Sequence, residues 1–179
     1  MKLATSIFTI ILALSFIVTF GQDKAKLLSD IRKEFKAINS DATLKKKVVS
    51  NKAFLKQMTD GGGQLTGFYK AGQIRKIVSW VGLSSGNDII DFYFKSNKLI
   101  FVYEQFNSFI YDSKKQKLRL DTTEKTFEGR YYFSNNKLID KITTGHKRFE
   151  DDNFDAEKTL LAGADDNRKL LNQKAKNKH

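Results

Sequence analysis

The sequence predicts an α+β protein in which an antiparallel β-meander sheet of about six strands carries an N-terminal and a C-terminal helix packed on it. Three observations support this fold class: an amphipathic helical stripe near the N-terminus, a hairpin motif that occurs three times, and a second helical pattern near the C-terminus. The chain has 179 residues, 40% of them hydrophobic, with no Cys and no Pro. This composition is typical of one globular domain, which must rely on a packed core because it cannot form disulfides.

The first part of the chain, residues 1–21, has the profile of a signal peptide. Lys2 precedes an uncharged run over residues 3–20, and Thr19-Phe20-Gly21 places small residues at the positions that a signal peptidase requires. We expect cleavage before Gln22, a periplasmic or secreted location, and a single mature domain of residues 22–179 that makes no membrane contact. The alternative is a retained membrane anchor, because the uncharged run lies at the lower limit of a spanning length.

Residues 22–58 form the expected helical N-terminal segment. Its first half has large apolar residues at spacings of three and four, with Lys and Arg between them, which is the pattern of an amphipathic helix. Residues 42–58 remain open between helix and strand, because the β-branched pair Val48-Val49 also suits a short strand. The apolar stripe consists of Leu28, Ile31, Phe35 and Ile38.

The N-terminal segment is also the most basic part of a chain whose formal charge is +12. From Gln22 to Gln57 there are ten Lys and Arg against four acidic residues. A basic surface can attract nucleic acid, anionic glycan or lipid headgroups. Export argues against nucleic acid, so we expect no nucleic-acid partner, and a solvated lysine-rich face is the simpler interpretation.

A seven-residue motif occurs three times within the predicted sheet region, residues 64–149. Each copy reads aromatic, aromatic, polar, two turn formers, polar and aliphatic. The turn formers tolerate the positive φ that tight two-residue hairpin loops require, so three hairpins and about six strands follow. The copies are Phe68–Ile74, Tyr93–Leu99 and Tyr132–Leu138, with turn pairs Ala71-Gly72, Ser96-Asn97 and Asn135-Asn136.

Directly opposed residues of a hairpin share one face of the sheet, so the motif also predicts which residues form the core. The core face pairs Tyr69 with Ile74, Phe94 with Leu99 and Phe133 with Leu138, joined by Phe92, Phe101 and Tyr131. The opposite face is mixed aromatic and basic, and it is either covered by the helices as well or free to bind a partner. The candidate binding residues on it are Phe68, Tyr93, Tyr132, Lys70, Lys95 and Arg130.

Two further segments complete the predicted domain. Residues 107–125 are mostly polar and predict a long excursion between the second and third hairpins, in the form of an irregular extra hairpin. Residues 152–175 again have apolar residues at helical spacing, which predicts a C-terminal helix. The acidic residues at the start of this segment stabilise a helix by interacting with the positive end of its dipole.

One catalytic string occurs, since Gly82-Leu83-Ser84-Ser85-Gly86 matches G-x-S-x-G. A nucleophile elbow needs a strand before the serine and a helix after it, whereas a strand-like run follows here. A hydrolase that uses Ser84, with His146 as the base, is therefore kept only as an alternative. With two His and no Cys the chain has no usual zinc set, and no phosphate or dinucleotide motif fits, so we expect no metal and no cofactor.

Three stretches resemble a family of uncharacterised exported proteins of Bacteroidetes-type bacteria. They are GGGQLTGFYKAGQIRKIVSW, DFYFKSNKLIFVYE and FEGRYYFSNNKLIDKITTGHKRFED, and the resemblance runs from Gly61 to Leu161. It implies a periplasmic or secreted address and brings neither an activity nor site residues. The repeated motif also resembles MORN-like hairpin repeats, which are mostly scaffolds or interaction modules.

The function predicted from the sequence is a non-enzymatic binding or interaction module of the cell envelope. Its partner is expected to be a protein, a peptide or an envelope glycan, held by the mixed aromatic and basic sheet face. The alternatives are the Ser84 hydrolase and a structural homo-oligomer that associates through the same face.

Overall fold

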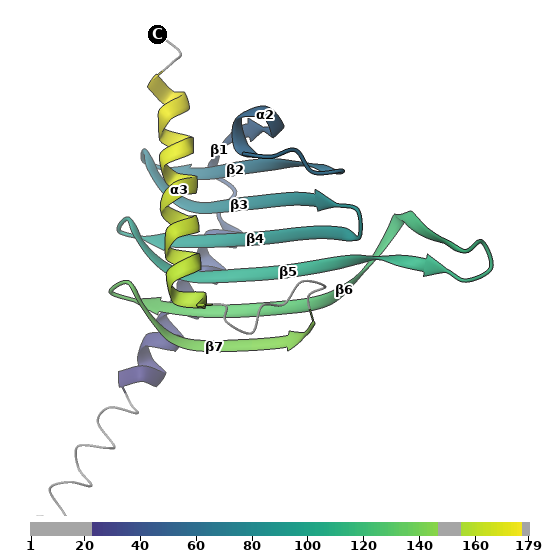
Figure 1. Ribbon diagram of the computed structural model, residues 1–179. Helices are drawn as coiled ribbons and strands as arrows, with labels where there is room; N and C mark the ends of the chain where they lie inside the picture. Colours follow the sequence, from purple (N-terminus) through teal and green to yellow (C-terminus); the bar gives the residue numbers. More distant parts are fainter. Residues whose placement is uncertain (1–22, 147–154, 177–179) are drawn as a thin grey trace, which may run out of the picture.

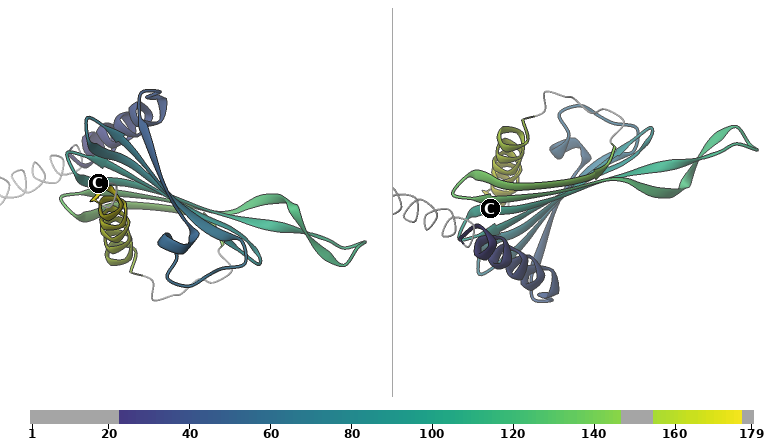
Figure 2. Two further views of the ribbon diagram at one scale, coloured as in Figure 1. Left: turned by 90° about the horizontal axis from the view of Figure 1, so that it is seen from above. Right: turned by 90° about the horizontal axis from the view of Figure 1, so that it is seen from below.

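The structure, a computed structural model that describes residues 23–146 and 155–176, confirms the α+β class. A single antiparallel sheet has seven strands in the order of the chain, so it is a meander with one strand more than expected. A helix lies on each face of this sheet (Figures 1 and 2). The strands are β1 (Lys45–Ser50), β2 (Gly62–Lys70), β3 (Gln73–Leu83), β4 (Gly86–Lys95), β5 (Lys98–Asp112), β6 (Lys117–Ser134) and β7 (Lys137–Gly145).

The helices are the N-terminal helix (residues 23–40), the short α2 (Asn51–Phe54) and α3 (Ala156–Lys176). The expected helical segment therefore needs a correction, because the part left open contains β1, the additional strand. The predicted signal peptide and the start of the predicted C-terminal helix lie outside the described residues. Among the helices that the structure describes, none is long and apolar enough to cross a membrane.

All three predicted turns are confirmed. Both turn residues have positive φ in each hairpin, with φ of 48° and 75° at Ala71-Gly72, 49° and 61° at Ser96-Asn97, and 50° and 59° at Asn135-Asn136. Two successive positive values define the type I′ loop, whose twist matches that of the strands it joins. The register beside each turn is also as expected, with Tyr69 opposite Ile74, Phe94 opposite Leu99 and Phe133 opposite Leu138.

One step beyond each turn the register shifts, which the hairpin motif does not predict. In β5, Leu99 lies opposite Phe94 but Phe101 lies opposite Tyr93, so Ile100 is an extra residue. Such a bulge reverses the alternation of the strand that follows it. Phe101 is therefore on the second face of the sheet, a correction to its predicted place on the core face. Arg75 in β3 and Ile139 in β7 occupy the equivalent positions.

The first face of the sheet packs against α3. The remaining eight residues predicted for the core face all lie in or against this cluster, together with Leu65, Ile77 and Val102. Helix α3 contributes Leu160 and Leu171, which are almost completely buried. The eight residues are Tyr69, Ile74, Phe92, Phe94, Leu99, Tyr131, Phe133 and Leu138.

The second face packs against the N-terminal helix. Phe35 from the helix stripe lies between two sheet residues, with ring centroids 4.9 Å from Tyr93 and 5.2 Å from Phe101. Both contacts are edge-on, the geometry that contributes about 0.5–1.5 kcal/mol beyond burial. Ile31 and Ile38 complete the buried stripe beside this aromatic cluster.

The predicted excursion is a two-stranded arm, residues 109–126, formed by the ends of β5 and β6 (Figure 1). Pairing between β4 and β5 ends at Ser108, and pairing between β6 and β7 ends at Phe127. Two backbone hydrogen bonds hold its base, from Phe109 N–H to the Ser85 carbonyl and from His146 N–H to the Thr126 carbonyl. Beyond them, within the described residues, each strand of the arm pairs only with the other. One register shift before its base, between Phe106 and Asn107, and one within it, between Phe109 and Ile110, make the pairing irregular, as expected.

Turn geometry generates a stability prediction at Ala71, whose φ of 48° is unfavourable for alanine. Ala71→Asn creates the Asn-Gly pair preferred in type I′ loops and should raise the free energy of unfolding by about 0.5–1 kcal/mol. Urea denaturation measures the change. The control is Ala42→Asn, at an exposed position without positive φ, and an equal gain there would contradict the explanation.

Candidate functional site

The aromatic residues of the predicted binding face are largely core. Tyr93 is 1% exposed and Tyr132 is 3% exposed, both beneath the N-terminal helix. Phe68 is half-buried, with the ammonium groups of Lys46 and Lys76 over its ring. Of the two alternatives for this face, the structure shows the covered one at Tyr93 and Tyr132, because the apolar helix stripe and the apolar sheet face bury one another.

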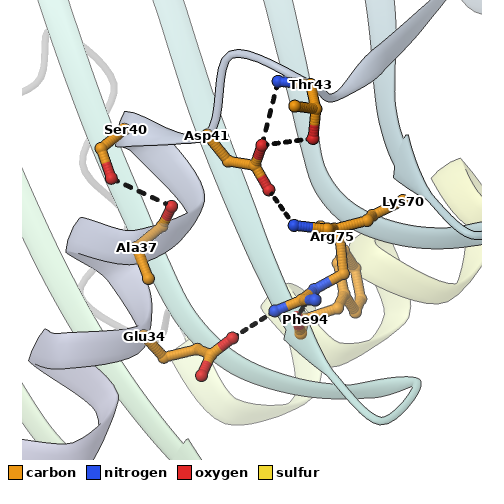
Figure 3. Close-up of polar contacts among 8 residues, drawn as sticks. All are labelled: Glu34, Ala37, Ser40, Asp41, Thr43, Lys70, Arg75 and Phe94. Carbon is orange, nitrogen blue, oxygen red and sulfur yellow. Dashed lines mark hydrogen bonds and ion pairs between the residues drawn. The ribbon is translucent and has the colours of Figure 1, made fainter.

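The predicted lysines hold the N-terminal helix on the sheet. The Nζ of Lys70 lies 2.6 Å from Asp41 Oδ2, and the Nζ of Lys95 lies 3.2 Å from Glu34 Oε2. The bulge residue Arg75 also pairs with Glu34, and its Nε donates to the carbonyl of Phe94 (Figure 3). The basic charge that was expected to bind a ligand is thus used in part to attach the helix.

Asp41 is the centre of the polar contacts at the end of this helix (Figure 3). Its Oδ1 accepts hydrogen bonds from the backbone N–H of Thr43 at 2.9 Å and from the Thr43 hydroxyl at 2.6 Å. The hydrogen bond from Lys70, followed by those from Thr43, holds the pKa of Asp41 well below its ordinary value. The carboxylate therefore stays ionised and fixes the turn from the helix into β1.

A buried polar network extends beneath the helix. Tyr93 Oη donates to Asp91 Oδ2 at 3.1 Å, and the Nζ of Lys76 lies 2.7 Å from the same oxygen. Burial, followed by the charge of Asp91, raises the pKa of Tyr93, so its hydroxyl remains a donor. This arrangement satisfies the buried carboxylate and has a structural role.

A groove of about 510 Å³ lies between the N-terminal helix and strands β5–β7. We call it the helix groove. Its walls are mostly apolar and aromatic, with cationic side chains from both the helix and the sheet. It includes two of the six predicted site residues, Tyr132 and Arg130. The lining residues are Ile31, Arg32, Phe35, Lys36, Phe101, Tyr103, Arg130, Tyr132 and Ile142.

The helix groove has more positive than negative charge. The Arg32 guanidinium lies 5.6 Å from the ring centroid of Tyr132, and neither Arg32 nor Lys36 has an ion pair within residues 23–146 and 155–176. Arg130 pairs with Glu128, the carboxylate beside the groove, and lies 5.9 Å from the ring centroid of Tyr103. Three cations therefore face one carboxylate.

Glu128 is itself shared among several donors. It pairs with Lys125 and accepts a hydrogen bond from Tyr103 Oη at 2.7 Å. The hydrogen bond from Lys125 is the main cause that lowers the pKa of Glu128, so this carboxylate is ionised at neutral pH. Since it is already engaged, it leaves the charges of Arg32 and Lys36 uncompensated.

Sequence reasoning missed Arg32 and Lys36, although the signal was visible. They are four residues apart and directly follow Ile31 and Phe35 of the apolar stripe, so they border the face that the helix buries. Their role depends on how the helix crosses β5–β7, which the local pattern does not contain.

Ser84 lies in a different setting from a nucleophile elbow. It is exposed in the two-residue turn between β3 and β4, and an antiparallel strand follows it instead of a helix. His146 follows the end of β7, where its backbone N–H donates to the Thr126 carbonyl at 2.9 Å. In the part of the chain that the structure describes, no group of three or more His, Cys, Asp or Glu gathers as a metal site.

The fold and the groove together define a class of protein, a meander sheet between two helices with an open amphipathic groove at one of them. No protein-family model, curated protein sequence or solved structure matches the chain. The function is therefore argued from the groove itself.

Burial generates a prediction for the two tyrosines. Tyr93→Ser and Tyr132→Ser should each lower the free energy of unfolding by about 3–5 kcal/mol, because each removes a buried ring from the aromatic cluster. Chemical denaturation followed by circular dichroism measures this loss. Tyr111→Ser, at an exposed ring of the arm, is the control and should stay within about 0.5 kcal/mol of the parent chain. Near-neutral values at Tyr93 and Tyr132 would contradict their placement in the core.

The lowered pKa of Asp41 generates a pH prediction. A carboxyl whose pKa is lower in the folded state stabilises the fold above its unfolded pKa, near 4, and this contribution is lost as the pH falls toward the folded value. Asp41→Asn should therefore lose less stability than the parent chain between pH 6 and pH 2. Lys70→Met, which removes the main partner, should flatten the profile in the same direction. Urea midpoints across this range provide the measurement, and an unchanged profile in Asp41→Asn would refute the assignment.

Proposed function

We propose that the protein is a non-enzymatic, exported binding module of the cell envelope that holds an acidic, partly apolar peptide segment in the helix groove. The observation that carries this proposal is the combination of apolar walls with uncompensated cations in one open groove. The N-terminal sequence pattern supports the exported address.

The size and walls of the groove suit a peptide side chain or two. Ligand sites commonly enclose about 300–1,000 Å³ and are lined mainly by apolar and aromatic residues, with few polar groups that fix orientation. The helix groove, at about 510 Å³, has this character. Ile142 is 41% exposed at its edge and gains burial when an apolar group covers it.

The cations select for negative charge. Arg32 offers a planar guanidinium that can donate two parallel hydrogen bonds to one carboxylate, and Lys36 adds a second positive charge one helical turn later. A hydrogen bond to a charged group is worth about 1.5–3 kcal/mol, more than a neutral one. Arg32 and Lys36 therefore favour a ligand with carboxylates beside its apolar part.

The groove chemistry favours a peptide over an envelope glycan. A glycan needs many hydrogen-bonding groups to replace the water that its hydroxyls lose. Here the hydroxyl of Tyr103 already donates to Glu128, and four of the other eight lining residues, Ile31, Phe35, Phe101 and Ile142, have no hydrogen-bonding side-chain group. A large apolar side chain flanked by acidic residues satisfies both the walls and the cations.

The test uses the chain from Gln22 and three probes in NMR titrations. Acetyl-Glu-Phe-Leu-Glu-amide should bind saturably and shift signals of Ile142 and of the helix residues around Arg32. Acetyl-Lys-Phe-Leu-Lys-amide and a uronic-acid disaccharide should bind at least about tenfold more weakly, because each lacks one of the two features.

Matched variants locate the site. Arg32→Gln with Lys36→Gln, and separately Ile142→Ser, should each weaken binding of the acidic peptide by at least about fivefold. The control pair Lys26→Gln with Lys33→Gln removes the same charge from exposed positions of the same helix and should have little effect. The proposal would be refuted if all three probes bound equally well, or if the control pair lost as much affinity for the acidic peptide as the Arg32 and Lys36 variant.

A further inference from the structure

The arm carries an unusual concentration of exposed apolar side chains. Tyr111 is 59% exposed, Leu118 is 37% exposed and Leu120 is 70% exposed. Tyr111 and Leu118 are directly opposed in the ladder, so they share one face of the arm. These three are among seven exposed large apolar residues in the described chain, so almost half of the set lies on one short hairpin.

The tip of the arm is also cationic. Lys114, Lys115 and Lys117 surround the turn, and none of them forms an ion pair with a residue of the described chain. Between Tyr111 and Leu120, Asp112 is the one acidic residue, and its carboxylate accepts hydrogen bonds from the backbone N–H groups of Lys114 at 3.0 Å and Lys115 at 3.1 Å. Asp121, which follows Leu120, forms an ion pair with Arg119 at 3.5 Å. The Asp112 carboxylate shapes the turn, and the tip keeps a net positive charge.

The arm projects away from the body of the protein. In Figures 1 and 2 it leaves the sheet where β5 ends and β6 begins, at the edge opposite the three type I′ hairpin turns. A flat surface can therefore meet the tip without first meeting the sheet or a helix. An isolated two-stranded hairpin is marginal in water, so a surface that buries its apolar residues also stabilises it.

We propose that the tip of the arm docks peripherally on an anionic membrane surface. The apolar side chains of Tyr111, Leu118 and Leu120 enter the interfacial layer, and the lysines remain at the level of the lipid phosphates. This combination of Tyr and Leu with flanking Lys suits an interface that is apolar on one side and wet on the other. The contact goes beyond the peptide groove, and it is an alternative to the expectation that the mature chain makes no membrane contact.

The charge pattern favours a bilayer over a pocket in a protein. A protein pocket that buried the tip would have to pair three lysines within four residues, and each unpaired charge would be heavily penalised. An anionic bilayer supplies diffuse negative charge and lets each ammonium group stay hydrated at the surface. The same apolar groups therefore reach a favourable environment without desolvating the cations.

The test is co-sedimentation of the chain from Gln22 with vesicles. Binding is expected to vesicles of phosphatidylcholine with 30% phosphatidylglycerol, and to fall at least about tenfold with pure phosphatidylcholine. Leu118→Ser with Leu120→Ser should weaken binding to the anionic vesicles by at least about tenfold. The triple variant Lys114→Ala, Lys115→Ala and Lys117→Ala should bind the anionic vesicles on the order of a hundredfold more weakly. The reason is that each cation near such a surface contributes about fivefold in affinity.

The control removes the same charge from exposed positions away from the arm, as Lys52→Ala, Lys56→Ala and Lys158→Ala. This triple variant should retain at least half of the binding, and circular dichroism verifies that every variant is folded. An equal loss in the control would overturn the proposal, because any basic surface would then suffice. Absence of vesicle binding by the parent chain at low salt, or tip-dependent binding to an acidic protein in its place, would overturn it as well.

Discussion

The structure depends on the burial of a sheet that is apolar on both faces. Alternation in the strands places Phe94 and Phe133 on one face and Tyr93 and Tyr132 on the other, so neither face can remain in water. Helix α3 covers the first of these faces, and the N-terminal helix covers the second. The N-terminal helix is therefore part of the domain rather than an appendage, and the groove exists only because this helix covers part of the second face.

Much of the fold follows from local signals. The residue types of the three turn pairs predict tight two-residue hairpin loops, which the structure contains. The residues next to each turn also have the cross-strand partners that were expected. Phe101 was misplaced because a bulge has no distinctive residue, and Ile100 reads as an ordinary strand position. The three bulges are meaningful together: they place Arg75, Ile100 and Ile139 beside neighbours that also face the N-terminal helix, which widens the surface that receives it.

The candidate site was predicted less well, for a related reason. From the sequence alone, a lysine on a sheet face that binds a ligand cannot be distinguished from one that forms an ion pair with an acidic residue of a helix. Lys70 and Lys95 find Asp41 and Glu34, which are distant in sequence and brought close only by the packing. Arg130 and Tyr132 do lie at the groove, yet its other cations come from the helix. Their combination is a tertiary property that no single stretch of sequence contains.

The meander topology has a consequence for the order of assembly. Every strand pairs with the next one along the chain, so the sheet can form by adding one hairpin after another. Each step closes only a short loop, and contacts between residues close in sequence form fastest. The contact between Lys24 and Asp140 instead spans 116 positions, from the first described helix to the last strand. Loop-closure entropy therefore favours a sequence of events in which the helix docks late, onto a sheet whose last strand is already in place.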